Sequence, residues 1–125
     1  MTTLEVLPET GSTNADLAAR IAAGTLVAEG HWLIADRQTA GRGRQGRQWF
    51  DGAGNFMGST VVERRAGDPP PGTLALVAGL AVLETVSPLI PPPHRPELKW
   101  PNDVLIGGAK LSGILLEAAG NGVIV

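Results

Sequence analysis

The sequence predicts an α+β fold, with a mixed or antiparallel β-sheet flanked by helices, and three observations support this. The chain has 125 residues, of which 43% are hydrophobic and 18% are charged, which is enough apolar material for one folded domain. Segments with strand and helix patterns alternate in the first two thirds, and the last third reads as a β-meander. The pair Gly107-Gly108 is a two-residue hairpin signal within that meander. We therefore expect a single domain over residues 1–125.

The first half is expected to hold three strands and one helix. Leu4 to Leu7 alternates apolar and polar residues before a proline, as strands do. A helix begins near residue 13, because Thr13-Asn14-Ala15-Asp16 fits a capping box, and Gly24 is its expected stop. Two further strands are predicted over residues 32–35 and 56–62, where β-branched and aromatic residues gather.

The second half is expected to hold one helix and several short strands. Residues 74–86 are apolar nearly all round, with Glu84 as their only charge, so we expect a helix that is buried between layers. Residues 87–96 contain five prolines and should form an extended surface connection. Short apolar runs, each expected to be a strand, cover residues 98–100, 103–106, 110–116 and 122–125.

Composition and charge exclude several classes of function. The formal net charge of −2 argues against a strongly basic nucleic-acid wrapper. Cysteine is absent, which excludes disulfides, thiolate catalysis and cysteine-ligated metal sites. No apolar run approaches the roughly 20 residues that a spanning helix needs, and the N-terminus lacks the pattern of a signal peptide. We therefore expect a cytoplasmic protein with no nucleic-acid partner and no membrane association.

The segment from residue 37 to residue 49 is the most informative stretch for function. It should be a loop, and it carries four of the eight arginines. Glycines at 41, 43 and 46 let backbone amides approach a ligand, and the interleaved guanidinium groups can bind phosphate or carboxylate. The spacing is neither that of a Walker loop nor that of a dinucleotide fingerprint. From composition alone, a mobile solvated loop is an equal alternative, and an RNA-binding Arg-Gly segment is a third.

A second group of charged residues lies on the predicted hairpin. The two-glycine turn would pair residue 105 with 110 and residue 103 with 112, so that Asp103 and Lys110 become diagonal neighbours on one sheet face. A carboxylate there could hold Mg²⁺ beside an ammonium group that holds a phosphoryl oxygen. Gly113 would let a ligand lie directly on the strand. The alternative is an ordinary cross-strand ion pair.

Ser12-Thr13-Asn14 carries a weaker signal. An N-cap explains these residue types, and the alternative is that the helix start presents hydroxyl and amide groups to a polar ligand. His31 and His94 lack a spaced partner, so no Ser/His/Asp arrangement is predicted.

Four blocks in register give the chain a specific resemblance. They are STN at residues 12–14, QTAGRGRQGRQW at 38–49, KWPND at 99–103 and KLSGIL at 110–115. In their order and spacing they resemble the biotin protein ligase family. The resemblance implies the N-terminal part of a class II synthetase-like biotin/lipoate ligase catalytic domain, without an N-terminal DNA-binding domain and without a C-terminal β-domain.

The resemblance also implies an activity. Such a protein uses ATP and Mg²⁺ to activate biotin as biotinyl-5′-AMP, then transfers biotin to a lysine of the biotin carboxyl carrier protein domain of a carboxylase. The alternatives are a ligase for lipoate or another acyl-carrier substrate, and a truncated relative that binds biotin without turnover. A homodimer is left open.

Site residues carried over from the family fall into three groups. Catalytic roles fall to Lys110 and Arg44, and the metal ligand is Asp103. Biotin and biotinyl-AMP would contact Ser12, Thr13, Asn14, Gln38, Gly41, Arg42, Gly43, Arg44, Lys110 and Gly113. The nucleotide and its phosphates would contact Arg47, Trp49, Lys99, Asn102 and Asp103.

Overall fold

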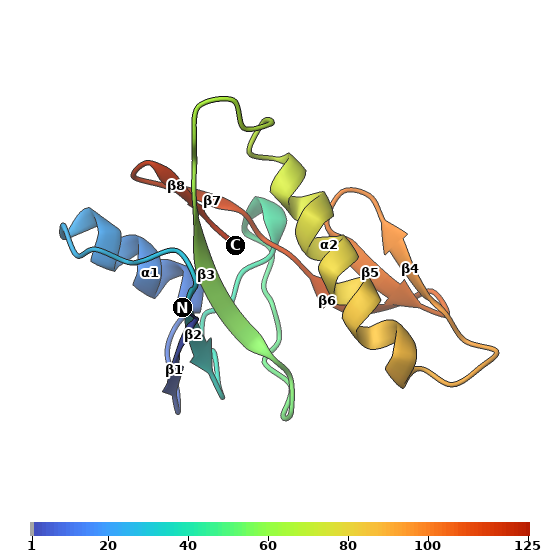
Figure 1. Ribbon diagram of the computed structural model, residues 1–125. Coiled ribbons are helices and arrows are strands. Elements are labelled where there is room, and N and C mark those ends of the chain that lie inside the picture. Colours follow the sequence, from blue (N-terminus) through green and yellow to red (C-terminus); the bar gives the residue numbers. More distant parts are fainter. Residues whose placement is uncertain (1) are drawn as a thin grey trace. The chain divides into compact units, whose positions relative to one another are not determined.

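The computed structural model describes residues 2–125, which divide into two compact units (Figure 1). The first unit is the chain up to Asp68 together with Glu117–Val125, and the second is Pro69–Leu116. Each unit combines one α-helix with one sheet, so the predicted α+β class is confirmed. Two separate sheets take the place of the one that we expected. That residues 1–125 act as a single catalytic domain stays a prediction.

The first unit is built on a five-stranded mixed sheet with the strand order β1-β2-β3-β8-β7. Its strands are β1 (Thr3–Leu7), β2 (His31–Ala35), β3 (Met57–Glu63), β7 (Glu117–Ala119) and β8 (Gly122–Ile124). β1 and β2 are parallel, and every other pairing in this sheet is antiparallel. The predicted strands over 4–7, 32–35 and 56–62 match β1, β2 and β3 to within one residue at each end.

Helix α1 (Thr13–Ala22) begins one residue earlier than the predicted capping box implies. The N-cap is Ser12, whose hydroxyl accepts a hydrogen bond from the Ala15 amide at 3.3 Å. At the other end, Gly24 has a φ of +81°, and the Thr25 amide donates to the Arg20 carbonyl at 2.9 Å. This is the Schellman arrangement, in which glycine adopts the left-handed conformation at low cost. The expected stop at Gly24 is therefore confirmed.

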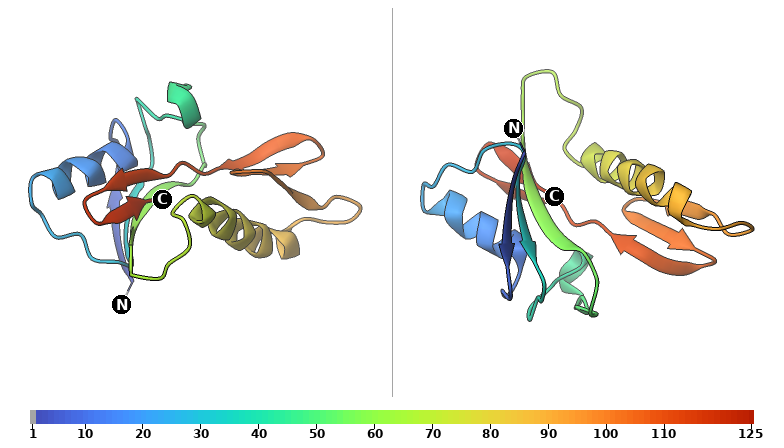
Figure 2. Two further views of the ribbon diagram at one scale, coloured as in Figure 1. Left: turned by 90° about the horizontal axis from the view of Figure 1, so that it is seen from above. Right: turned by 60° about the horizontal axis from the view of Figure 1, so that its bottom comes forward.

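The core of the first unit lies between α1 and one face of the sheet (Figure 2). Leu17 of α1 packs against Leu33, Val61 and Ile124, and all four are at most 5% exposed. Alternate residues of β2 and β3 point to this face, as the two-residue period of a strand requires. Tight packing at this position fixes the helix N-terminus over β3, where the polar residues described below meet.

Gly122 shows how closely the strands approach in this core. A Cβ atom at this position would lie 2.9 Å from the Val62 carbonyl oxygen and 3.2 Å from Val61 Cγ1. We expect Gly122→Ala to destabilise the fold by about 1–3 kcal/mol, because the backbone of β3 or β8 must shift to admit the methyl group. Urea unfolding followed by circular dichroism measures the loss. Gly72→Ala is the control, since nothing lies within 4 Å of its added Cβ. Equal stability of the two variants would contradict the expectation.

A partly exposed ion-pair group joins β1, α1 and β2. Nη1 and Nη2 of Arg20 each donate to one oxygen of the Glu5 carboxylate at 2.8 Å, and His31 Nε2 lies 3.2 Å from Glu5 Oε2. The hydrogen bonds from Arg20 hold the pKa of Glu5 below its ordinary value of 4.5, and His31 contributes less. Because the folded-state pKa is the lower one, the stabilisation is present above about pH 4.5 and is lost as the pH falls through the folded-state value.

Glu5→Gln should therefore flatten the dependence of stability on pH. The wild-type chain is expected to exceed the variant by up to about 1 kcal/mol at pH 7, a small figure because both side chains are about a third exposed to screening solvent. At pH 3 the difference should shrink towards zero. Urea unfolding at the two pH values measures this, with Glu97→Gln, an exposed carboxylate of the second unit, as the control. A difference that grows at low pH would contradict the assignment.

The second unit packs one helix on a three-stranded antiparallel sheet. Helix α2 (Thr73–Val86) precedes a 3₁₀ turn (Ser87–Leu89) and the strands β4 (Pro96–Lys99), β5 (Asp103–Ile106) and β6 (Ala109–Gly113), in the order β4-β5-β6. The predicted helix over 74–86 and the strand over 103–106 are confirmed. The predicted strand over 110–116 is too long, because the chain leaves this sheet after Gly113.

The expectation that the second helix is buried between layers is wrong for the described residues. Only Ala75 and Gly79 of α2 are buried, whereas Leu76, Val77 and Leu80 are 43–62% exposed. A Cβ atom on Gly79 would lie 3.1 Å from Leu98 Cδ2, so the small residues form the face that contacts the sheet. Apolar composition predicted the helix but could not predict which side is covered. No helix within residues 2–125 is long and apolar enough to cross a membrane.

Candidate functional site

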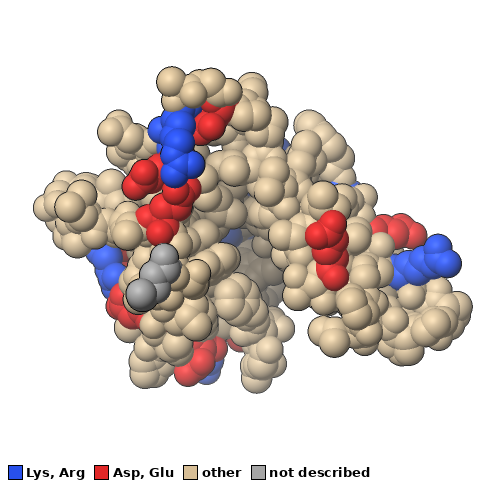
Figure 3. Space-filling view, in the orientation of Figure 1, with Lys and Arg blue, Asp and Glu red and all other residues tan. Residues whose placement is uncertain are grey.

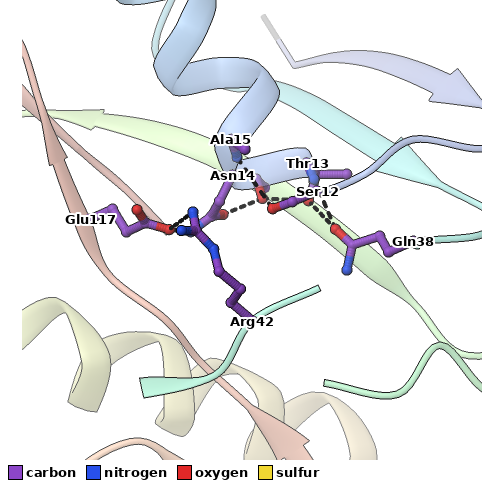
Figure 4. A network of polar contacts seen from close by, with 8 residues as sticks. Ser12, Thr13, Asn14, Ala15, Gln38, Arg42 and Glu117 are labelled. Carbon is purple, nitrogen blue, oxygen red and sulfur yellow. Dashed lines mark hydrogen bonds and ion pairs between the residues drawn. The ribbon is translucent and has the colours of Figure 1, made fainter. Parts of the chain in front are cut away.

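The polar residues at the N-terminus of α1 are buried. Ser12, Thr13, Asn14 and Ser59 are between 1% and 9% exposed, and they come from the start of α1 and from the face of β3 beneath it. Burying hydroxyl and amide groups is costly unless each finds a partner. Thr13, Asn14 and Ser59 meet their partners in one network, whereas the Ser12 hydroxyl accepts from the Ala15 amide. Figure 4 shows this region together with Gln38, Arg42 and Glu117.

Hydrogen bonds link this network into a row that ends at Glu117. Gln38 Oε1 accepts from the Thr13 amide at 2.8 Å and contacts Thr13 Oγ1 at 3.1 Å. Thr13 Oγ1 lies 2.6 Å from Ser59 Oγ, and Ser59 Oγ is hydrogen-bonded to Asn14 Oδ1. Asn14 Nδ2 donates to Glu117 Oε1 at 3.1 Å. We call these five residues, Gln38, Thr13, Ser59, Asn14 and Glu117, the polar row.

Gln38 is held in place by its own backbone. Its backbone forms a parallel bridge with that of Thr10, and its backbone N–H donates to Asp51 Oδ2 at 3.2 Å. Arg37 Nε donates to the same oxygen at 2.7 Å, and this bond lowers the pKa of Asp51. The side chain of Gln38 is therefore positioned by two neighbouring contacts before any ligand arrives.

The arginine-rich segment folds into a tight hairpin-like loop. Arg42 forms an antiparallel bridge with Gln48, the Trp49 amide donates to the Gly41 carbonyl at 3.0 Å, and a 3₁₀ turn spans Arg44–Gly46. A Cβ atom on Gly41 would lie 3.1 Å from Gln38 Nε2 and 3.3 Å from the Trp49 carbonyl oxygen. The predicted loop is confirmed, and the glycine at 41 allows its close approach to Gln38.

One arginine of the loop, Arg42, lies close to the polar row. Arg42 Nη2 lies 3.7 Å from Glu117 Oε1, the oxygen that also accepts from Asn14, while Arg44 and Arg47 are exposed. On the face drawn in Figure 3, basic and acidic side chains lie beside one another and form no large patch of one sign. The RNA-binding alternative for the arginine-rich loop stays a hypothesis.

In the second unit, the predicted meeting of Asp103 and Lys110 is confirmed. Lys110 Nζ lies 2.9 Å from Asp103 Oδ1, and the side chains are 41% and 19% exposed. Residue 105 pairs with residue 110 as expected, but Asp103 pairs with Gly113 and not with residue 112. The register shifts between Val104 and Leu105, and such an irregularity cannot be predicted from the length of the turn.

Asn102 has a structural role at the start of this hairpin. Its Nδ2 donates to the Ile114 carbonyl at 2.7 Å, and the Ile114 amide donates to the Asn102 carbonyl at 3.1 Å. A hollow of about 190 Å³ lies beside it, lined by Lys99, Asn102 and Asp103 together with apolar residues of α2 and β4. Contact of Lys99 and Asn102 with nucleotide phosphates stays a prediction.

Asp103 fits a single ligand of Mg²⁺ rather than a preformed metal cage. Within residues 2–125, no group of three or more His, Cys, Asp or Glu side chains could hold a metal ion. Asp103 Oδ1 is buried and makes no hydrogen bond with suitable angles, although the ammonium of Lys110 lies beside it. Mg²⁺ in nucleotide sites commonly takes one or two carboxylates and completes its shell with phosphate and water.

The predicted site residues are divided between the two units. Ser12, Thr13, Asn14, Gln38, Gly41, Arg42, Gly43, Arg44, Arg47 and Trp49 lie in the first, and Lys99, Asn102, Asp103, Lys110 and Gly113 lie in the second. Contacts join Thr13, Asn14, Gln38 and Arg42 into one cluster, and Asp103 and Lys110 into another. The roles of these residues in binding and catalysis stay predictions.

Sequence reasoning missed Ser59 and Glu117. Ser59 lies between Met57 and Val61 on the buried face of β3. A hydroxyl among apolar residues at every second position of a strand is the signal that could have found it. Glu117 follows directly after the apolar run that ends at Leu116, but nothing in that run says which face it will point to. Its partners on α1 and in the arginine loop come from more than 70 residues away in the sequence.

The chain is similar in sequence and fold to known proteins of one family. The model of the biotin/lipoate A/B protein ligase family matches residues 11–125. A curated biotin--[acetyl-CoA-carboxylase] ligase of Mycobacterium tuberculosis is 53% identical over 119 residues, which are 93% of this chain and 44% of that relative. One of Paracoccus denitrificans is 43% identical over 117 residues, 94% of this chain and 48% of the relative.

A solved structure gives the same result at the level of the fold. The biotin protein ligase from Aquifex aeolicus in complex with biotin and ATP matches with a TM-score of 0.83 and 35% sequence identity, covering 99% of this chain and 50% of that chain. The chain thus spans about half the length of the curated relatives that it matches. The resemblance inferred from the four sequence blocks is confirmed.

Proposed function

Because the chain belongs to the biotin/lipoate A/B protein ligase family, we propose that it carries the biotin-recognition and adenylation residues of a biotin protein ligase. In this proposal, biotin reacts with MgATP to give biotinyl-5′-AMP and pyrophosphate. The biotinyl group then passes to a lysine of a biotin carboxyl carrier protein domain. The polar row supports the proposal most directly, because it gathers hydrogen-bond donors and acceptors around three buried residues, Thr13, Asn14 and Ser59, in an arrangement suited to a cyclic urea.

The polar row offers both kinds of hydrogen-bonding group within a short span. Ser12, Thr13 and Asn14 sit at the N-terminus of α1, where the partial positive charge of the helix favours an acceptor such as a urea carbonyl. Gln38 Oε1 and the hydroxyl of Thr13 can accept from an N–H group. A dithiolane ring has no hydrogen-bond donor, so this arrangement favours biotin over lipoate as the substrate.

The first chemical step needs cations more than it needs a side-chain nucleophile. A carboxylate oxygen of biotin attacks the α-phosphorus of ATP, the bond from that phosphorus to the bridging oxygen breaks, and pyrophosphate leaves. Two anions must approach each other, so fixed positive charge is the main requirement. In the proposal Lys110 binds the carboxylate and α-phosphate oxygens, and the carboxylate of Asp103 beside it keeps the ammonium oriented. Mg²⁺ bound at Asp103 would neutralise phosphate charge.

The arginine loop would protect the product of this step. Biotinyl-5′-AMP is a mixed anhydride that water can hydrolyse, so it must be enclosed until the acceptor arrives. Arg42, Gly43 and Arg44 would fold over the biotinyl and phosphate groups, and Trp49 would cover the adenine. In the second step the neutral amine of the acceptor lysine attacks the acyl carbon, AMP leaves, and an amide bond forms.

Calorimetric titration with biotin, with and without MgATP, tests the binding half of this proposal on the full chain. Biotin-dependent exchange of pyrophosphate into ATP tests the adenylation half. We expect saturable biotin binding and measurable exchange. Binding without exchange would identify a non-catalytic biotin-binding relative. A thermal shift with lipoate and none with biotin would identify a lipoate-type ligase.

A further inference from the structure

The polar row contains one hydrogen-bond contact more than its hydroxyl protons can supply. Three oxygen–oxygen contacts run in sequence, from Gln38 Oε1 to Thr13 Oγ1, from Thr13 Oγ1 to Ser59 Oγ, and from Ser59 Oγ to Asn14 Oδ1. Each hydroxyl carries a single proton, so Thr13 and Ser59 together supply two. One of the three contacts must lack a proton at any moment.

Glu117 is the cause of this shortage. A carboxylate can only accept hydrogen bonds, so Asn14 must direct its amide nitrogen towards Glu117 Oε1 and its carbonyl oxygen towards Ser59. The proton of Ser59 then goes to Asn14, and the proton of Thr13 goes either to Ser59 or to Gln38. The Arg42 guanidinium lies 3.7 Å from the same Glu117 oxygen, and its positive charge strengthens the preference for a carboxylate at position 117.

The site cannot correct the shortage by turning the Gln38 amide. If Gln38 directed Nε2 towards Thr13, that nitrogen would face the Thr13 backbone N–H, which now donates to Oε1 at 2.8 Å. Both ends of the row are therefore fixed, one by a carboxylate and the other by a backbone amide. The oxygens between them present unshared lone pairs, and a donor from outside the chain would satisfy them.

We infer that Glu117 is a specificity-determining residue, which acts through Asn14 and Ser59 to make the polar row select a ligand that carries an N–H donor. This inference rests on the proposed function and refines it, since the two ureido N–H groups of biotin are donors of the required kind. Glu117 is a positioning residue, because it touches Asn14 and Arg42 and the inference gives it no contact with the reacting atoms.

Glu117→Gln separates this role from a merely structural one. The side-chain amide that this substitution introduces can donate to Asn14 Oδ1, which lets Asn14 turn its Nδ2 towards Ser59. Ser59 can then donate to Thr13, and Thr13 to Gln38 Oε1, so that every contact in the row has a proton without a ligand. The free variant should be at least as stable as the wild type, and its row should no longer require an external donor.

The test compares ligands that differ in their N–H groups. The probes are biotin, imidazolidin-2-one as a minimal cyclic urea, and 1,3-dimethylimidazolidin-2-one, which keeps the carbonyl and lacks both donors. Calorimetry measures biotin binding, and NMR titration of the full chain measures the two small ureas. We expect the wild type to prefer the unmethylated urea by about tenfold or more, since methylation removes the donor and leaves a buried acceptor without a partner.

In Glu117→Gln this preference should fall several-fold, and the affinity for biotin should drop by about tenfold or more. The ratio of the two ureas within each variant controls for the bulk of the methyl groups. Ser59→Ala should also lower the preference, and adding it to Glu117→Gln should cause little further loss, because both changes interrupt the same row. Glu97→Gln, an exposed carboxylate of the second unit, is the matched control and should retain the wild-type ratio.

The possible results separate this inference from the proposed function. An unchanged ratio in Glu117→Gln, or a clear loss of thermal stability in that free variant, overturns the role of Glu117 even if biotin binds and reacts. If the wild type selects the unmethylated urea and the variant does not, the role of Glu117 stands even where biotin exchange fails. A wild type that binds neither biotin nor the ureas overturns both.

Discussion

Lys110→Ala is expected to lower the rate of biotin-dependent adenylate formation by about 10²-fold or more while the fold is retained. Lys110 is the residue to which we assign the charge stabilisation of the first step, and removing one fixed donor from a developing anionic centre costs about that much in other enzymes. Its side chain is 41% exposed on β6, so its removal leaves little unfilled space. Pyrophosphate exchange into ATP measures the rate, and circular dichroism checks the fold.

The matched control for this prediction is Arg95→Ala. Arg95 is an exposed cation that lies just before β4 and outside the candidate site, so its loss changes the net charge by the same amount. It should leave exchange close to the wild-type rate. Full exchange activity in Lys110→Ala would remove Lys110 from the mechanism. Equal losses in both variants would indicate a general effect of charge.

Arg44→Gly is expected to release biotinyl-5′-AMP into solution about tenfold faster or more. Arg44 is exposed in the free chain, at the start of the 3₁₀ turn, so it is available to close over a bound adenylate. Without its guanidinium the loop loses a charge-assisted contact to the phosphate, and the intermediate dissociates before transfer. Rapid filtration after a single turnover, followed by chromatography of the filtrate, measures the free adenylate.

Arg64→Gly serves as the control for the loop prediction. Arg64 is also exposed, but it follows β3 and lies outside the arginine-rich loop. It should retain the intermediate as the wild type does. If Arg44→Gly forms the adenylate normally and releases it no faster than the wild type, the loop has no enclosing role. The two predictions are independent, since loss of Lys110 prevents the intermediate and loss of Arg44 sets it free.

Much of the first unit could be predicted because its signals are local. The alternation in Leu4 to Leu7, the polar cap at residues 12–14 with a glycine stop, and the β-branched run of β3 each depend on residues close in sequence. The arginine loop was equally predictable, because alternating glycine and arginine residues favour neither a helix nor a strand. These segments contain most of the residues that we assign to biotin.

In the second unit, local sequence signals predict the elements but not their packing or the full strand register. The apolar pattern of α2 predicted a helix with bounds correct to one residue, but the small face at Ala75 and Gly79 makes the contact with the sheet, and larger residues remain exposed. A two-residue turn predicted the partner of Leu105 correctly, and the shift beyond Val104 then changed the partner of Asp103. Close packing of specific side chains decides both outcomes, and sequence periodicity does not record it.

The sequence by itself determined the family, the α+β class, the loop and helix that carry the polar groups, and the pairing of a carboxylate with an ammonium on one hairpin. These follow from short-range spacing and from four blocks in register. Only the tertiary structure decided that Ser59 and Glu117 complete the polar row, because they reach Asn14 from strands 45 and 103 residues away. The direction of each hydrogen bond in that row depends on all its members together, and so it emerges only when the chain has folded.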